Sequence, residues 1–165
     1  MGSDIHGEAI GDQSGQSISL SDEGTTIAIG ASMNDGTGEM AGHVRVWGWT
    51  GVTWTQIGGD IDGEAVSDLS GISVSLSSNG TTLAIGATGN SESGMYAGHV
   101  RVYKWNGLAW VQLGADIDGE AELDQSGVSV SLSASGTTLA VGAAWNSGAS
   151  MAGHVRVYGW DATLQ

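Results

Sequence analysis

The sequence contains no cysteine, no proline and no phenylalanine, and very few basic residues. Without cysteine, the chain can form no disulfide, no thiolate nucleophile and no zinc–thiolate site. Only four lysines and arginines stand against 18 aspartates and glutamates, and the resulting net charge of −14 disfavours nucleic acids and anionic membranes as partners. No apolar run reaches the roughly 18 residues that a membrane-spanning helix needs. We therefore expect neither a nucleic-acid partner nor a membrane partner.

Glycine is abundant, with 29 residues, and much of it recurs in an internal repeat. The segment Asp4–Ala9 returns twice in related form, and each step is 56 residues long. Its copies occupy residues 60–65 and 116–121. A Gly-His-Val-Arg-Val segment likewise occurs three times, starting at Gly42, Gly98 and Gly153. The sequence predicts a single repeat domain over residues 1–165, with units at about 4–59, 60–115 and 116–165.

Each unit has the residue pattern of short β-strands, and no segment has a useful helical period. In the second unit, the predicted strands are residues 73–76, 82–86, 99–103 and 110–113. The Asn106-Gly107 pair between the last two strands is typical of a type I′ hairpin turn. Four strands per unit and a period in the fifties indicate an all-β fold of β-propeller blades, with three four-stranded antiparallel repeats per chain.

Three segments of the unit carry a resemblance to a known family. They are Ser-Gly-Ile-Ser-Val-Ser-Leu (70–76), Leu-Ala-Ile-Gly-Ala (83–87) and Gly-His-Val-Arg-Val-Tyr (98–103). In these segments the chain resembles the FG-GAP family of integrin-type propeller repeats. The resemblance implies a propeller fold, an extracellular location and, within that family, a calcium-dependent adhesion module. The chain departs from the family pattern because Ser-Gly replaces Phe-Gly, no proline follows Gly-Ala, and the calcium loop is shortened to four residues.

The two ends of the chain align through the repeat. Gln165 aligns with Trp110 and Met1 aligns with Ile57, so two repeat positions separate the end of one copy from the start of the next. Three blades are too few for a closed propeller, which usually has about four to eight. We predict a homodimer in which two chains join head to tail into a six-bladed ring. The alternative is a β-trefoil, in which three four-stranded units close within one chain.

Acidic and basic residues occupy fixed repeat positions. Twelve of the 18 acids lie in the three copies of one acidic turn, and each copy of the strand at 99–103 carries one arginine. The histidine two residues before each arginine points to the same strand face; these are His43, His99 and His154. We predict that each arginine holds an acidic turn as a structural latch. The latch residues are Arg45, Arg101, Arg156, Asp60, Asp62, Glu64, Asp116, Asp118 and Glu120.

The acidic turns also offer several oxygen ligands, which makes calcium the alternative interpretation. Their spacing differs from that of an EF-hand loop, and His6 replaces the second aspartate in the first copy. The structural interpretation is favoured, and we expect no metal site and no required cofactor.

Tryptophans and variable loops supply the remaining candidates for binding. Trp49 and Trp54 flank one hairpin, Trp105 and Trp110 flank its copy, and indole pairs of this kind pack in cores or stack on sugars. The loops at residues 32–41, 88–97 and 144–152 differ most between copies, and loops on a rigid scaffold often carry ligand sites. Their candidate ligand residues are Asn34, Asn90, Tyr96, Trp145 and Asn146.

No arrangement of serine, histidine and aspartate suggests a catalytic triad, and no phosphate-binding loop is present. We predict a non-catalytic propeller that serves as a scaffold or protein-binding module and assembles into a ring. A lectin-like carbohydrate-binding propeller and a calcium-dependent adhesion module are the alternatives.

Overall fold

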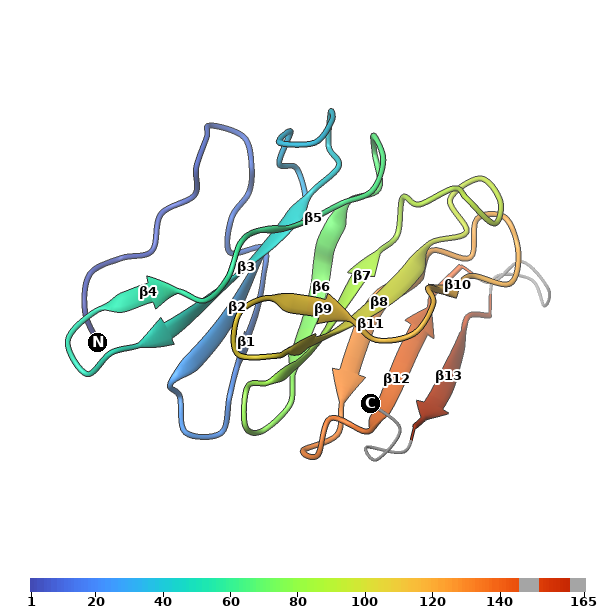
Figure 1. Cartoon of the computed structure of the whole chain (residues 1–165). Coiled ribbons are helices and arrows are strands. Elements are labelled where there is room, and N and C mark those ends of the chain that lie inside the picture. The colour runs from blue at the N-terminus through green and yellow to red at the C-terminus, as the bar shows by residue number, and fades with distance from the viewer. Residues whose placement is uncertain (146–151, 161–165) are drawn as a thin grey trace.

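The computed structural model describes residues 1–145 and 152–160, and these residues form three antiparallel β-sheets that succeed one another along the chain (Figure 1). Blade 1 contains β1 (Ser17–Leu20), β2 (Thr26–Ala31), β3 (His43–Trp49), β4 (Trp54–Gln56) and β5 (Ile61–Asp62). Blade 2 contains β6 (Ser70–Leu76), β7 (Thr82–Ala87), β8 (His99–Trp105), β9 (Trp110–Gln112) and β10 (Ile117–Asp118). Blade 3 contains β11 (Ser126–Leu132), β12 (Thr138–Ala143) and β13 (His154–Gly159). The predicted all-β fold of antiparallel propeller blades is confirmed.

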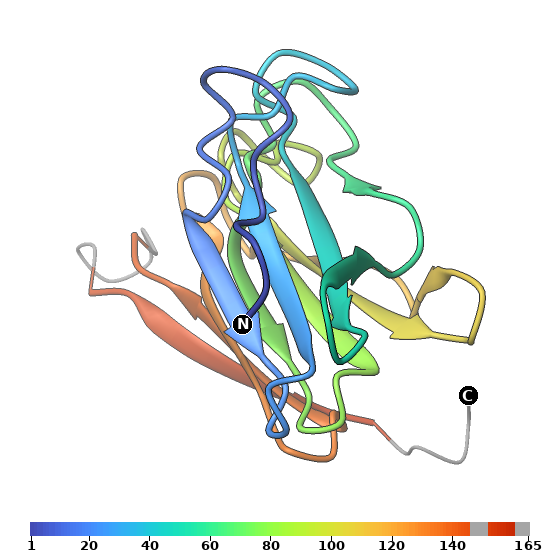
Figure 2. The same cartoon turned by 90° about the vertical axis from the view of Figure 1, so that its left-hand side faces the viewer.

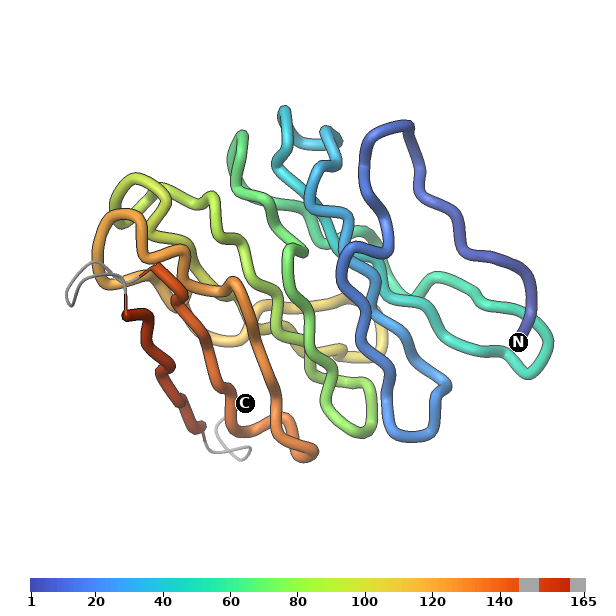
Figure 3. The backbone as a smooth tube through the Cα atoms, turned by 180° about the vertical axis from the view of Figure 1, so that it is seen from behind, coloured from blue at the N-terminus to red at the C-terminus, as the bar shows by residue number. Residues whose placement is uncertain are grey.

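The sheets lie side by side in chain order. Seen from behind, blade 1, blade 2 and blade 3 follow one another from blue to red (Figure 3). In the side view, the hairpins that end in β4 and β9 project from the same side of the molecule (Figure 2). The described residues include no helix long and apolar enough to cross a membrane.

The outer edge of blades 1 and 2 is built from two short strands rather than one. In blade 1, β4 pairs with the end of β3 through Trp49 and Trp54, whereas β5 pairs with its beginning through Val44 and Ile61. In blade 2, β9 and β10 repeat this arrangement along β8. The sequence predicted one outer strand per blade and a turn after it; the turn itself contributes the additional strand. In blade 3, the outer edge of β13 has no partner strand among the described residues.

Adjacent blades approach each other closely at Gly71 and at Gly127. Gly71 has a φ of 86° within a bulge of β6, and its carbonyl accepts a 2.6 Å hydrogen bond from Ser17 Oγ of blade 1. Gly127 of β11 has a φ of 88° and accepts the equivalent bond, 2.7 Å long, from Ser73 Oγ. A Cβ atom on Gly86 would collide with the Gly127 carbonyl. The absence of a side chain at Gly86 therefore allows blades 2 and 3 to pack this closely.

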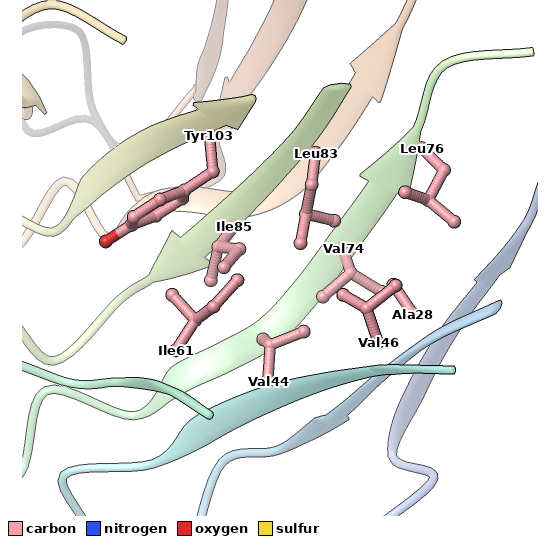
Figure 4. Packing of buried hydrophobic residues seen from close by; sticks show 9 residues of the cluster. All are labelled: Ala28, Val44, Val46, Ile61, Val74, Leu76, Leu83, Ile85 and Tyr103. Carbon is pink, nitrogen blue, oxygen red and sulfur yellow. The ribbon is translucent and has the colours of Figure 1, made fainter. Parts of the chain in front are cut away.

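Alternation along the strands gives each blade two apolar faces. Figure 4 shows Val44 and Val46 of blade 1 facing Val74 and Ile85 of blade 2 across the first core. Ile61 of β5 belongs to the same core. A second core joins the opposite face of blade 2 to blade 3; its buried residues are Ala84, Val100, Val102, Leu139 and Val141. All six residues of β7 are buried because blade 2 is covered on both faces.

Candidate functional site

The segments that link one blade to the next carry the acidic turns. We call residues 57–64 and 113–120, together with their copy at residues 1–8, the acidic connectors. The connector at residues 57–64 contributes β5 to blade 1 and then continues into blade 2. A side chain of blade 2 that binds this connector therefore joins two blades.

Arg101 of β8 makes this contact. Its Nη2 donates a 2.7 Å hydrogen bond to the carbonyl oxygen of Asp62, and its Nη1 lies 3.4 Å from Glu64 Oε1. The guanidinium carbon also lies 5.6 Å from the centre of the Tyr103 ring, within cation–π range. Arg101 is only 5% exposed, so these contacts compensate the charge in a site with little water.

The same contact occurs in each copy. Arg45 donates to the His6 carbonyl at 2.7 Å and lies 3.5 Å from Glu8. Arg156 donates to the Asp118 carbonyl at 2.5 Å and lies 3.5 Å from Glu120. Each arginine thus binds one backbone carbonyl and one glutamate of its connector. The three contacts all lie within the chain.

The first aspartates of the connectors have a different partner. Asp60 accepts a 2.6 Å hydrogen bond from Gln56, and Asp116 accepts one of the same length from Gln112. These bonds join each aspartate to the short strand that precedes it. The structure therefore brings the predicted latch arginines together with the glutamates and with the backbone of Asp62 and Asp118.

The histidines lie beside the same glutamates. His99 is fully buried, and its Nδ1 lies 3.9 Å from Glu64 Oε2 and 3.5 Å from Asp116 Oδ2. Neither ring nitrogen has a hydrogen-bond partner among the described residues. His43 repeats the arrangement, with Nδ1 at 3.8 Å from Glu8 Oε2. The sequence placed each histidine on the strand face of its arginine, and this shared face was the available signal that both would meet the same glutamate.

Burial determines the titration of this cluster. Burial raises the pKa of Glu64 and the nearby Asp116 raises it further, although Arg101 opposes both effects. Burial also lowers the pKa of His99, and the positive charge of Arg101 lowers it further, against the opposing charges of Asp116, Asp68 and Asp118. Burial raises the pKa of Tyr103.

The tryptophan pairs lie against the connectors. The rings of Trp105 and Trp110 have centroids 5.6 Å apart and are tilted by 49°, and Trp110 Nε1 donates a 2.9 Å hydrogen bond to the Ile57 carbonyl. Trp49 and Trp54 form the same pair at 5.4 Å and 57°. These indoles hold the start of a connector and so contribute to packing between blades.

The predicted ligand loops divide into buried and exposed residues. Asn34 and Asn90 are buried, and their amide groups donate to Asp12 and Asp68. Tyr96 and Trp145 are exposed, and Tyr96 lines a hollow of about 630 Å³ together with Met95 and Val66. Asn146 lies outside the described residues. Tyr96 and Trp145 are thus the predicted loop residues that a ligand could reach.

The fold and these contacts define a chain of three β-propeller blades joined by acidic connectors. No family model and no curated protein sequence matches the chain. Among solved structures, the chain is similar to a chain of Kuenenia stuttgartiensis hydrazine synthase, which contains a β-propeller, with a TM-score of 0.51 and 15% sequence identity. The match covers 87% of this chain but only 37% of the hydrazine synthase chain. At this identity the likeness supports the fold alone.

Replacing Arg101 with lysine tests the contact between blades. Lysine keeps the charge but cannot reach the Asp62 carbonyl and Glu64 with a rigid fork, so we expect Arg101→Lys to lower the free energy of unfolding by about 1–3 kcal/mol. The reverse exchange on the same strand, Lys104→Arg, should change it by less than about 0.5 kcal/mol. Urea unfolding measures both values. Equal effects of the two variants would contradict the role given to Arg101.

The lowered pKa of His99 predicts acid sensitivity. Because its pKa in the folded chain lies below the ordinary value of 6.5, unfolding takes up a proton below that pH, and stability falls as the pH decreases towards the folded-state pKa. The contribution of one group is at most about 1.4 kcal/mol per pH unit. In metal-free buffer, His99→Gln should flatten the fall in melting temperature below pH 6.5. Glu64→Gln should steepen the fall, since the raised pKa of Glu64 favours the folded state on acidification. Identical pH profiles for all three proteins would contradict this assignment.

Proposed function

We propose that the chain is half of a closed six-bladed ring and that this non-catalytic propeller serves as a scaffold for protein binding. The observation that carries the proposal is the presence of one uncovered apolar face at each end of the three-blade array. The ring is formed with a second copy of the same chain. We also propose that the repeat is FG-GAP-like. The three segments at residues 70–76, 83–87 and 98–103, which carry the resemblance, support this.

The first uncovered face belongs to blade 1. Ile18 is 62% exposed and Leu20 is 54% exposed. Their repeat equivalents in blade 2, Val74 and Leu76, are buried in the core against blade 1. Fully burying a side chain of this size stabilises by about 1.5–3 kcal/mol. Blade 1 therefore has a face that is built for contact with another blade.

The second uncovered face belongs to blade 3. Val155 and Val157 of β13 are each 68% exposed. Their equivalents, Val100 and Val102, are buried in the core between blades 2 and 3. The uncovered face of blade 1 corresponds to the face by which blade 2 packs on blade 1. The uncovered face of blade 3 corresponds to the face by which blade 2 packs on blade 3. A head-to-tail contact between two copies would therefore repeat the internal contact between blades.

The polar contacts are complementary in the same way. The backbone amide of Leu76 donates a 2.9 Å hydrogen bond to Ser19 Oγ of the preceding blade, and the amide of Leu132 donates an equivalent bond to Ser75 Oγ. By repeat symmetry, the amide of Leu20 would donate to the partner's Ser131. Likewise, Ser129 would donate to the partner's Gly15, as Ser17 does to Gly71.

The outer edge of β13 fits the same scheme. β5 and β10 pair with the beginning of β3 and β8, where Ile61 opposes Val44 and Ile117 opposes Val100. In the ring, the partner's Ile5 would oppose Val155. A heterologous contact either closes into a ring or extends into a filament. Propeller rings usually have about four to eight blades, and six is the multiple of three in this range, so two chains would form the ring.

The mass in solution tests the ring. We expect about 33 kDa, twice the chain mass of 16.6 kDa, by light scattering after size-exclusion chromatography. Gly142→Ala should give a monomer, because its Cβ would meet the partner's Gly15 carbonyl as a Cβ on Gly86 would meet that of Gly127. Within the chain, the added methyl of Gly142→Ala meets mainly the rotatable Ser129 side chain.

The control is Gly59→Ala. A Cβ on Gly59 meets nothing within 4 Å, and the equivalent residue in the next repeat, Ala115, is already alanine. This variant should keep the dimer mass. A wild-type mass of 16.6 kDa, or a dimer that persists in Gly142→Ala, would overturn the proposed ring.

A further inference from the structure

His99 is a buried imidazole with two carboxylates beside it. It is fully buried, and neither of its ring nitrogens has a hydrogen-bond partner in the part of the chain that the structure describes. Because a neutral imidazole always carries one N–H group, its burial without an acceptor costs about 1–3 kcal/mol. The carboxylates of Glu64 and Asp116 approach the same nitrogen, Nδ1, from two different connectors.

We propose that Glu64, His99 and Asp116 bind a divalent transition-metal ion of the zinc class. The ion would lie between His99 Nδ1, Glu64 Oε2 and Asp116 Oδ2. Three protein ligands leave a fourth position of a tetrahedral zinc ion for water. This site lies outside the loops considered for ligands and does not require the ring.

The distances favour shared coordination over hydrogen bonding. Nδ1 lies 3.9 Å from Glu64 Oε2 and 3.5 Å from Asp116 Oδ2, whereas N–H···O hydrogen bonds measure about 2.7–3.2 Å. Two ligands bound to one tetrahedral zinc at about 2.0–2.1 Å lie roughly 3.3–3.4 Å apart. Small side-chain rotations therefore suffice to bring each of the two carboxylate oxygens to the separation from Nδ1 that shared coordination requires.

Arg101 orients one of the ligands. Its Nη1 lies 3.4 Å from Glu64 Oε1, which leaves Oε2 directed to His99. Two carboxylates, those of Glu64 and Asp116, stand beside His99 against the single positive charge of Arg101. The imidazole selects the class of ion, since calcium and magnesium bind oxygen ligands and zinc also binds nitrogen.

The same three residue types meet in blade 1. The ligand atoms of Glu8, His43 and Asp60 all lie within 4.8 Å of one another, and His43 is buried. Glu8 is again held by an arginine through its other oxygen, since Arg45 Nη1 lies 3.5 Å from Oε1. The repeat of the sequence thus places a histidine, a glutamate and an aspartate together in blade 1 as in blade 2.

Blade 3 supplies two of the three ligands. His154 Nε2 lies 4.0 Å from Glu120 Oε2. The repeat equivalent of Asp116 would be the partner's Asp4, so this third site rests on the proposed ring. The number of ions per chain consequently separates the two proposals: about three in the ring and about two in a monomer.

Calorimetric titration of the metal-free chain with zinc chloride tests the proposal. We expect saturable binding of about three ions per chain for the wild-type protein and about two for Gly142→Ala, together with a raised melting temperature. Calcium chloride should give neither heat nor a thermal shift. If the wild-type chain is monomeric yet binds about two ions, the ring fails and the metal site stands.

Variants of the ligands assign the sites. Glu64→Gln should weaken zinc binding at one site by at least about 10-fold. Loss of a residue that only supports a metal ligand already weakens binding by about this factor, and Glu64 is a proposed ligand itself. Its side chain is partly exposed, so the fold should tolerate the change, and circular dichroism checks this. His99→Gln should remove one ion per chain, and the exposed His6→Gln serves as the control that keeps all of them. Absence of saturable zinc binding, or binding that His99→Gln and Glu64→Gln leave unchanged, would overturn the proposal.

Discussion

Every blade has two apolar faces, and the rest of the structure depends on covering both. The alternation of side chains along β7 directs Leu83 and Ile85 towards blade 1 and Ala84 towards blade 3. One neighbouring sheet cannot bury both apolar faces of such a blade, whereas a sheet with one polar face needs to bury only the other. Blade 2 meets the requirement within the chain, whereas blades 1 and 3 each meet it on one face only. The assembly that we propose with further blades would use the same alternation that builds the core.

The acidic connectors hold successive blades in a fixed order. Each connector completes the outer edge of one blade and is then bound by the arginine of the next, as the pairing of Ile61 with Val44 and the contact of Arg101 with Asp62 show. The acidic composition of the chain is therefore concentrated where blades join. Zinc-class ions at the histidines would place a second link at the same junctions, because Glu64 and Asp116 come from successive connectors. Backbone pairing, arginine contacts and metal ligation would then act on one segment.

Much of the architecture could be predicted from the sequence because the repeat restricts it. The 56-residue step and the alternation in segments such as 73–76 were sufficient for the strand class and for the blades. β5 and β10 were not predicted, since a two-residue strand has no measurable period and its partner strand lies in another part of the chain. The early start of β6 at Ser70 was missed because the bulge at Gly71 interrupts the alternation.

The candidate site was predictable to a smaller extent. The common strand face of His99 and Arg101 followed from their spacing, and so did the expectation that arginine and acidic turn would meet. The approach of Asp116 to His99 depends on β10 pairing with β8, so it required the register that the sequence did not reveal. The burial of Asn34 and Asn90 likewise depends on contacts with Asp12 and Asp68, which lie 22 residues away in each case.

An engineered cross-link tests most directly the claim that a second copy covers both open faces. The chain has no cysteine, so a double variant with Ile5→Cys and Val155→Cys can form a disulfide only between these positions. Opposed residues on paired strands have Cα atoms about 4.5–5.5 Å apart, which suits a disulfide. The ring predicts that mild oxidation yields a covalent dimer of two identical links and no larger species, as seen by mass spectrometry of the non-reduced protein. A covalent monomer, an open ladder of larger products or the absence of cross-linking would contradict it.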